Sequence, residues 1–229
     1  MTRRRERWVT VVTSVMTLAG LLCLVGCPPP QVREISIDYQ EIGIIQLDSR
    51  FVPSQITLVR GRPARLHLTD ASGKAQATFR IDALDVHAQL KSAELTQITL
   101  SAGQVGELDG KRFTCRESGN GGTFRVVKSG EAIRPTAAGG VVEVSVVMSD
   151  ELAAPHSIVL KRNVPAKLYV TKTTGEEEDD TFLIEAWNIE EDINVGKVTV
   201  IELTPTKTEH VTFMGITTPS SRGTIQVVD

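Results

Sequence analysis

Short runs of β-branched and other apolar residues, many with alternating polar positions, recur from about residue 35 to the end of the chain. This pattern is typical of β-strands, because successive side chains of a strand point to opposite faces. Most runs end near glycine, proline, asparagine or aspartate, which favour turns. The pattern predicts strands at 35–37, 42–45, 55–59, 65–68, 78–81, 97–100, 123–127, 141–148, 157–160, 167–170, 181–184, 197–203 and 224–228.

Helical periodicity is rare in the same part of the chain. We expect one short helical turn around 149–154 and no longer helix. Many short strands at even spacing, separated by glycine and proline turns, predict an all-β protein built as a sandwich or a barrel.

The chain also contains an internal repeat. Four blocks return in the same order at nearly constant offsets of 101 to 103 residues: 51–58 at 152–160, 63–66 at 165–168, 78–81 at 181–184 and 122–127 at 223–228. Glycine, serine and alanine are frequent between the two copies, which indicates a flexible connection. We therefore predict two tandem domains, 34–128 and 141–229, joined by a linker at 129–140.

The first residues predict an export signal. Four arginines within the first seven residues precede an uncharged, largely apolar stretch, and this order is typical of a signal peptide. The stretch ends at Leu24-Val25-Gly26-Cys27, which resembles the bacterial lipobox, whose cysteine receives a lipid such as palmitate. We predict a signal peptide at 1–26, a lipidated Cys27 and a proline-rich linker at 27–33. The alternative is an uncleaved membrane helix, which needs about 20 apolar residues.

Export and lipidation leave one thiol and an acidic chain. Cys23 would leave with the signal and Cys27 would carry the lipid, so Cys115 would be the single free cysteine and no internal disulfide is expected. Removal of residues 1–26 takes away four arginines and one glutamate, which changes the formal net charge from −3 to −6. This acidic balance argues against a nucleic-acid partner, which would require a basic face.

The strand and turn residues of the first repeat resemble a cupredoxin. The resemblance rests on Phe51-x-Pro53-x-x-Ile56-x-Leu58, on Thr78-Phe79-x-Ile81, and on Phe113-x-Cys115. It implies a Greek-key β-sandwich of seven or eight strands in each repeat. It also implies where copper ligands would stand, since copper-bearing members use two histidines, a cysteine and usually a methionine.

Few residues of this chain match that ligand set. The first histidine position holds Ala77 in the first repeat and Asp180 in the second, and the cysteine positions hold Cys115 and Gly215. Neither histidine nor methionine occurs in 116–122. We therefore expect no copper cofactor. Cys115 stays open as a buried apolar side chain or as a reactive or metal-binding thiol.

Other candidate metal ligands are scattered. His67 alternates with leucines and is expected to face solvent, while His87, His156 and His210 are isolated from one another in the sequence. The acidic run 176–180 is expected to be a solvated loop, because like charges repel and stay in water. Calcium binding is the alternative, since carboxylate oxygens suit this cation.

These observations favour a binding protein over an enzyme. The chain has no nucleophile elbow, phosphate-binding loop, zinc-protease motif or dinucleotide fingerprint, so no catalytic residue is predicted. We expect an extracytoplasmic lipoprotein, anchored to the membrane of the cell envelope through Cys27, that binds a protein partner through its loops. The alternatives are a copper-binding or electron-transfer protein that uses Cys115, and a pair of immunoglobulin-like adhesion domains.

Overall fold

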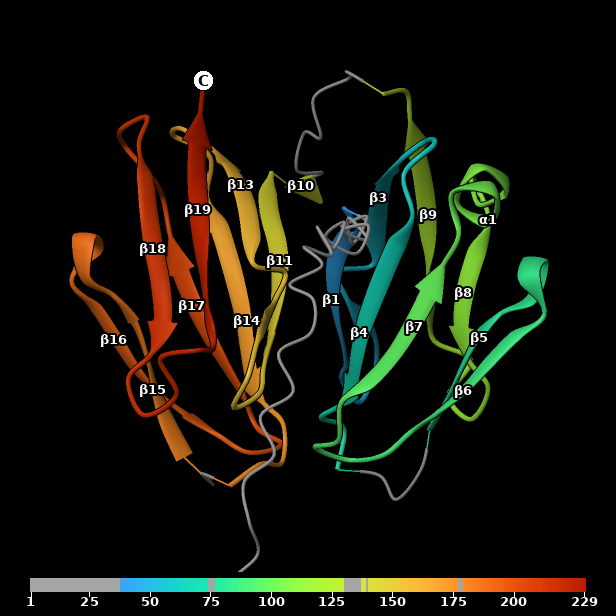
Figure 1. Cartoon of the computed structure of the whole chain (residues 1–229), viewed down its shortest axis with the longest axis horizontal. Coiled ribbons are helices and arrows are strands. Elements are labelled where there is room, and N and C mark those ends of the chain that lie inside the picture. The colour runs from blue at the N-terminus through green and yellow to red at the C-terminus, as the bar shows by residue number, and fades with distance from the viewer. Residues whose placement is uncertain (1–37, 74–76, 130–136, 139, 177–178) are drawn as a thin grey trace, which may run out of the picture. The chain divides into compact units, whose positions relative to one another are not determined.

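The computed structural model describes residues 38–73, 77–129, 137–138, 140–176 and 179–229. These residues are mostly β-strand, with one short α-helix and two single-turn 3-10 helices (Figure 1). No helix among them is long and apolar enough to cross a membrane. The all-β prediction is confirmed, whereas the predicted signal peptide, Cys27 and the proline-rich linker lie outside the described residues.

The first sandwich consists of two sheets around one apolar core. Sheet A has the strand order β2-β1-β4-β7, and sheet B has the order β3-β9-β8-β5-β6. Its elements are β1 (Gln40–Gln46), β2 (Phe51–Val52), β3 (Gln55–Val59), β4 (Ala64–Asp70), β5 (Ala77–Ile81), η1 (Asp82–Leu84), β6 (Val86–Leu90), β7 (Thr96–Leu100), α1 (Ala102–Glu107), β8 (Arg112–Cys115) and β9 (Gly121–Val127).

The second sandwich repeats this arrangement. Sheet C has the order β10-β11-β14-β17, with β12 also paired to β11, and sheet D has the order β13-β19-β18-β15-β16. Its elements are β10 (Ala137–Ala138), β11 (Val141–Met148), β12 (Ala153–Ala154), β13 (Ser157–Lys161), β14 (Ala166–Lys172), β15 (Asp179–Ile184), η2 (Glu185–Trp187), β16 (Ile189–Asn194), β17 (Val198–Leu203), β18 (His210–Gly215) and β19 (Arg222–Val228).

Strand register confirms the internal repeat. β1 pairs in parallel with β4, and β11 pairs in parallel with β14 at positions exactly 102 residues later in both strands. β3 and β13 likewise run parallel to β9 and β19. A parallel pair in each sheet does not fit the two antiparallel sheets of an immunoglobulin-like sandwich. The expected cupredoxin-like layout, with two tandem sandwiches, is the one observed.

Each sandwich encloses its own hydrophobic core. The first core is centred on four fully buried phenylalanines, Phe51, Phe79, Phe113 and Phe124, whose ring centroids lie 5.1–5.7 Å apart in mostly edge-on contacts. The second core contains the equivalent pair Phe182 and Phe213, at 5.5 Å. Residues 37–229 nevertheless form one compact unit, so independent folding of 34–128 and 141–229 stays a prediction.

A third apolar cluster joins the two sandwiches. Ile45 and Val52 of sheet A contact Val147 and Tyr169 of sheet C, and all four side chains are buried. Both faces of sheet A are therefore covered, one by sheet B and the other by sheet C. For this reason the prediction that His67 faces solvent is wrong: it is 2% exposed, and its Nε2 is paired with the carboxylate of Glu41.

An ion pair reinforces this interface. The guanidinium of Arg50 donates hydrogen bonds of 2.7 and 2.8 Å to the carboxylate of Glu143 and one of 2.7 Å to the hydroxyl of Tyr169. The hydrogen bond from Arg50 lowers the pKa of Glu143, although partial burial opposes this effect. Charge-assisted, bidentate pairs of this type are among the stronger hydrogen bonds in proteins and fix the orientation of the groups they join.

The backbones of the two sandwiches approach each other closely at Gly43 of β1. The hydroxyl of Ser145 donates a 2.6 Å hydrogen bond to the carbonyl oxygen of Gly43. A Cβ atom at Gly43 would overlap the carbonyl oxygen of Ala154 and lie 2.8 Å from that of Ser145. Glycine is required here because two backbones approach each other, and not because of an unusual backbone conformation.

The short helix is not where the sequence analysis placed it. The expected turn at 149–154 contains β12 instead, and the only α-helix among the described residues is α1. The hydroxyl oxygen of Ser101 accepts the backbone N–H of Gln104, and the side-chain oxygen of Gln104 accepts the backbone N–H of Ser101, which completes a capping box. The predicted linker at 129–140 also contains a two-residue strand, β10, paired with β11.

Gly43→Ala should destabilise the protein by about 1–3 kcal/mol, because the added methyl group forces two packed backbones apart. Gly103→Ala in α1 is the matched control, because the nearest atom to its Cβ lies 3.9 Å away. Urea unfolding of both variants measures the effect. Equal stability of the two variants would contradict the close packing at Gly43.

Candidate functional site

The two sandwiches place equivalent residues at the ends where the cupredoxin resemblance implies ligands. Strand pairing sets Phe79 opposite Cys115 in the first sandwich and Phe182 opposite Gly215 in the second. The register therefore agrees with the equivalence of Cys115 and Gly215 that the sequence predicted.

Cys115 lies at the end of β8 and is 1% exposed. The side-chain amide of Gln46 donates to its sulfur at 3.2 Å, and the thiol donates to a carboxylate oxygen of Glu117 at 3.4 Å. Neither neighbour is the imidazole or thioether that suits copper, since one is an amide N–H donor and the other a hard carboxylate oxygen. The buried-thiol interpretation of Cys115 fits this environment.

Glu117 is already engaged by other groups. Its carboxylate accepts hydrogen bonds from the side chain of Thr78 at 2.7 Å and from the backbone N–H of Thr78 at 2.6 Å. These bonds, led by the one from the Thr78 hydroxyl, lower the pKa of Glu117 to about 2. The carboxylate thus fixes the loop after β8 against β5, and the loop is not arranged as an open ligand site.

The histidines do not converge on Cys115 or on one another. His67 is buried at the interface between the sandwiches, where it pairs with Glu41. The exposed His87 of β6 pairs at 3.2 Å with Asp85, which lies in the turn before this strand. His156 and His210 are exposed. Within the described ranges, no group of three histidine, cysteine, aspartate or glutamate side chains is placed to hold a metal ion. The residues present do not fit a copper centre.

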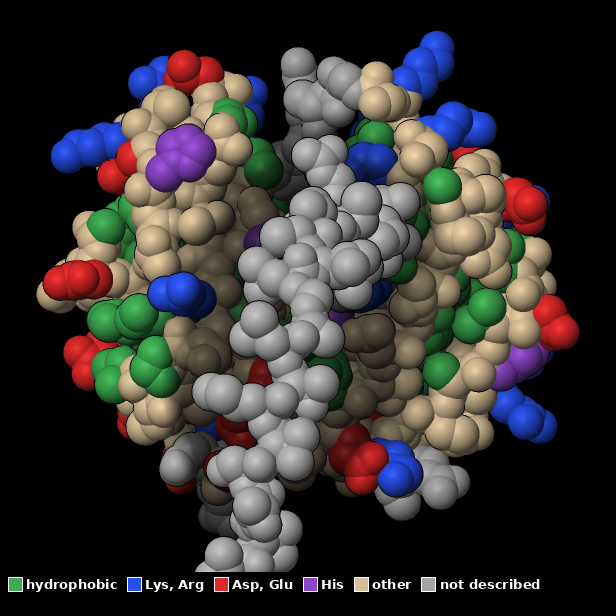
Figure 2. Space-filling view, in the orientation of Figure 1, with side chains coloured by type: hydrophobic (Ala, Val, Ile, Leu, Met, Phe, Trp, Pro, Cys, Tyr) green, Lys and Arg blue, Asp and Glu red, His purple; other side chains and the backbone are tan. Residues whose placement is uncertain are grey.

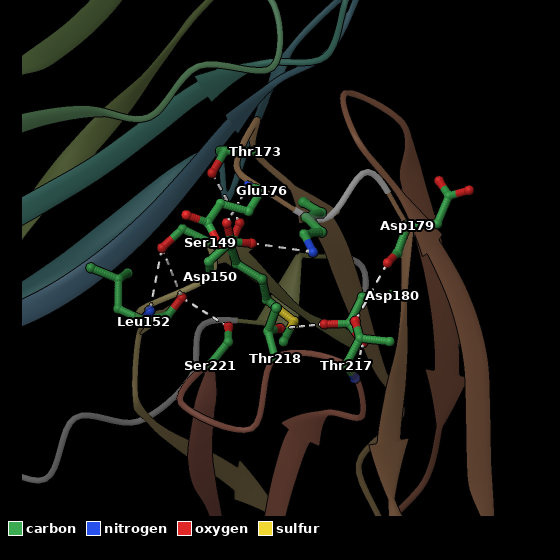
Figure 3. A network of polar contacts seen from close by, with 12 residues as sticks. Ser149, Asp150, Leu152, Thr173, Glu176, Asp179, Asp180, Thr217, Thr218 and Ser221 are labelled. Atoms are coloured by element: carbon green, nitrogen blue, oxygen red, sulfur yellow. Dashed lines mark hydrogen bonds and ion pairs between the residues drawn. The ribbon is translucent and has the colours of Figure 1, made fainter.

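Asp180 fills the corresponding end of the second sandwich (Figure 3). It is 4% exposed and accepts hydrogen bonds from the backbone N–H groups of Thr181 at 2.7 Å and Thr217 at 2.8 Å, and from the hydroxyl of Thr218. A Cβ atom at Gly215 would overlap the Asp180 carboxylate, so glycine leaves the space that the carboxylate occupies.

The buried position of Asp180 corrects the expectation for the acidic run. Burial raises the pKa of Asp180, but the hydrogen bonds from Thr218 and Thr217 outweigh it and leave the pKa below its ordinary value. Asp179 is exposed, and its side chain points away from Asp180 in Figure 3. The run is therefore only partly a solvated loop, and Asp179 and Asp180 begin β15.

Further polar contacts tie the loops of this end together (Figure 3). The hydroxyl of Ser221 donates to the carbonyl oxygen of Leu152 at 2.9 Å. The carboxylate of Asp150 lies 3.4 Å from the ammonium group of the buried Lys172 and accepts the backbone N–H of Glu176 at 2.5 Å. These contacts stabilise loop positions, and they bring no group of three carboxylates together among the described residues. Residues 177–178 of the acidic run, on which the calcium alternative also rests, lie outside the described residues.

The residues that sequence analysis missed line a groove between the sandwiches. Its volume is 380 Å³, and it is formed by the first halves of β1 and β11 together with β3 and β13 and the prolines before them. Many lining residues are repeat partners 102 positions apart, such as Ile42 and Val144, Pro53 and Pro155, or Ile56 and Ile158. The repeat offset was the one sequence signal that could have paired them.

Comparisons with known proteins do not assign the chain to a family. No protein-family model matches the chain, and no curated protein matches it. Similar solved structures include the metal-binding domain of the Cu(I)-exporting P-type ATPase of Streptococcus pneumoniae D39. The two sequences are 21% identical, the match covers 42% of this chain and 95% of that domain, and the TM-score is 0.37.

Two further solved structures are similar in the same way. Copper nitrite reductase from Nitrosomonas europaea shows 10% identity over 84% of this chain and 95% of its own, with a TM-score of 0.34. The periplasmic domain of cytochrome oxidase subunit II from Bradyrhizobium japonicum shows 12% identity over 42% of this chain and 88% of its own, with a TM-score of 0.32. At these scores the likeness carries no conclusion about function.

Asp180→Asn should lower the stability at neutral pH by about 1–3 kcal/mol, because a buried, charged acceptor is lost. A depressed pKa stabilises the fold above the unfolded value of about 4, and this stabilisation is lost as the pH falls below it. The variant should therefore lose less stability than the natural protein between about pH 5 and pH 2. Urea unfolding at a series of pH values tests this.

The exposed neighbour gives the control for that experiment. Asp179→Asn removes the same charge one residue away and should change stability by less than about 0.5 kcal/mol at any pH in this range. If the two variants had the same pH profile, Asp180 would not stabilise this end of the sandwich.

Proposed function

We propose that this chain is a lipid-anchored protein of the bacterial cell envelope that faces the periplasm or the exterior. In this proposal it binds a protein partner and performs no catalysis. The observation that carries the proposal is that the implied ligand positions hold internally paired side chains, with Cys115 against Gln46 and Glu117, and Asp180 against Thr217 and Thr218. Such ends are structural supports, which leaves surfaces and loops for recognition.

The basic start, the apolar stretch and the lipobox-like Leu24-Val25-Gly26-Cys27 support export and lipidation. Membrane attachment through Cys27 would hold the two sandwiches next to the bilayer. Basic and acidic side chains are interspersed around the rim of the face shown in Figure 2. This mixed surface suits a protein partner better than a nucleic acid, which would require clustered positive charge.

A copper-binding or electron-transfer protein that uses Cys115 is the second candidate. It is favoured by the cupredoxin-like strand layout and by a single thiol at the cysteine position of that layout. The surroundings of the sulfur argue against it, because Gln46 offers an amide N–H group, which does not ligate metals, and Glu117 offers a hard oxygen to a metal that prefers soft ligands.

Lipidation is expected at Cys27 and at no other cysteine. In a bacterium fed an alkyne-bearing palmitate, the full chain should acquire the label, and Cys27→Ser should abolish it. Cys23→Ser is the matched control, because this residue lies four positions earlier in the same segment and should leave labelling unchanged. Labelling of the Cys27→Ser variant would contradict a lipid anchor at this position.

Copper should not bind tightly to the detergent-solubilised full chain. Titration with Cu(I) and Cu(II) is expected to give no stoichiometric complex and no thiolate-to-copper absorption band, in the natural protein and in Cys115→Ser alike. A one-to-one complex with such a band, lost in Cys115→Ser, would overturn the binding-protein proposal and favour the copper carrier.

A further inference from the structure

We propose that the groove between the two sandwiches binds an extended, apolar segment of the partner protein, which pairs with the free edge of β3 as an added strand. This inference rests on the proposed function as a protein-binding module and names the site and the chemistry of the partner. Strand addition of this kind draws affinity from main-chain hydrogen bonds and specificity from side-chain pockets.

The direction of the backbone groups of β3 follows from its hydrogen bonds. Among the described strands, β3 is at the edge of sheet B and pairs with β9 alone. The N–H of Thr123 donates to the carbonyl oxygen of Ser54, and the N–H of Arg60 donates to that of Val127. In a parallel ladder, alternate residues direct both backbone groups to the same neighbour. The even-numbered residues of β3 therefore face β9, and the odd-numbered residues face away from it.

Gln55 and Thr57 direct their backbone groups into the groove, which both residues line. Among the described residues, no hydrogen bond to these outward-facing N–H and C=O groups is present. Val59 is different, because Gln40 closes this end of the edge: Gln40 accepts the N–H of Val59 at 2.5 Å and donates to its carbonyl oxygen at 3.1 Å. Within the described ranges, Gln40 thus covers the edge at Val59, and no described residue covers it at Gln55 and Thr57.

The opposite wall has the same construction. Thr224 donates to the carbonyl oxygen of His156, and Arg162 donates to that of Val228, so the odd-numbered residues of β13 face away from β19. Ser157 and Val159 line the groove with these outward groups. An extended segment is the ligand that matches these outward-facing N–H and C=O groups, because each of its residues carries one N–H donor and one C=O acceptor.

The side chains of the groove indicate an apolar, uncharged segment. The half-buried Ile42 and Val144 and the prolines at 53 and 155 give it apolar walls. The acidic groups on its lining are already paired within the protein: Glu41 with His67, Glu143 with Arg50, and Asp38 with Arg62. A charged side chain of the partner would find no free counter-charge among these acids.

Amide hydrogen exchange of the full chain in detergent micelles tests the open edge without any ligand. We expect the amides of Gln55 and Thr57 to exchange at least roughly tenfold faster than those of Ile56 and Leu58, because unpaired amides exchange without opening of the sheet. Equally slow exchange at all four positions would show that the edge is already covered and would overturn the proposal.

Binding is tested with a displayed library of random twelve-residue peptides selected on the same protein. Peptides with alternating apolar residues should be enriched, and their binding should protect the amides of Gln55 and Thr57. Thr57→Pro, which removes the N–H at an edge position that tolerates proline, should weaken binding by roughly tenfold or more. Thr57→Val retains the backbone donor and the side-chain shape, and should bind as the natural protein does.

All of the remaining outcomes would contradict the proposal. A library without enrichment would overturn it, as would enriched peptides that bind Thr57→Pro unchanged. Binding lost in Val144→Asp but kept in Thr57→Pro would assign the groove to an apolar group and not to a strand. The copper titration tests the proposed function separately from the groove. Copper binding at Cys115 would overturn the proposed function, but it would leave the exchange rates at the edge of β3 unaltered.

Discussion

Ser145 can donate its hydrogen bond to Gly43 because the glycine has no side chain, and the contact between the two sandwiches depends on this approach. Because sheets A and C lie so close together, the polar residues on their facing sides are shielded from solvent. Glu41 therefore pairs with His67, and Glu143 with Arg50, since an unpaired charge at such a site would be costly. The groove lies beside the same contact, so its width is set by the same two backbones.

The two ends that the family resemblance marks as ligand sites are filled differently but to the same effect. In the first sandwich a thiol is held between an amide and a carboxylate, and in the second a carboxylate is surrounded by donors of the threonines. The hydrogen bonds of both arrangements come from within the protein, although the side-chain oxygen of Gln46 has no partner among the described residues. Such internal bonds favour rigid loops. A rigid frame with closed ends and open strand edges at β3 and β13 suits the extended segment that we propose for the groove.

Much of the fold was accessible from the sequence, because alternating apolar residues and the repeat both report on the cores. Strands such as β3 and β11 were predicted at their observed bounds, while α1 was missed although Ser101 and Gln104 form a recognisable capping box. His67 and Asp180 were placed in solvent by local pattern alone. Their burial depends on which sheet covers sheet A and on which loop meets β15, and no local pattern contains that information.

The exchange of glycine for serine between the repeats has a consequence for the history of the molecule. A symmetric dimer of one ancestral sandwich would set identical residues against each other at the axis, since its interface is self-complementary. Gly43 facing Ser145 breaks that rule, and the repeat partners Thr57 and Val159, which both line the groove, also differ. Covalent linkage of the halves permits such asymmetry, and a groove with two unlike walls distinguishes the two ends of whatever lies in it.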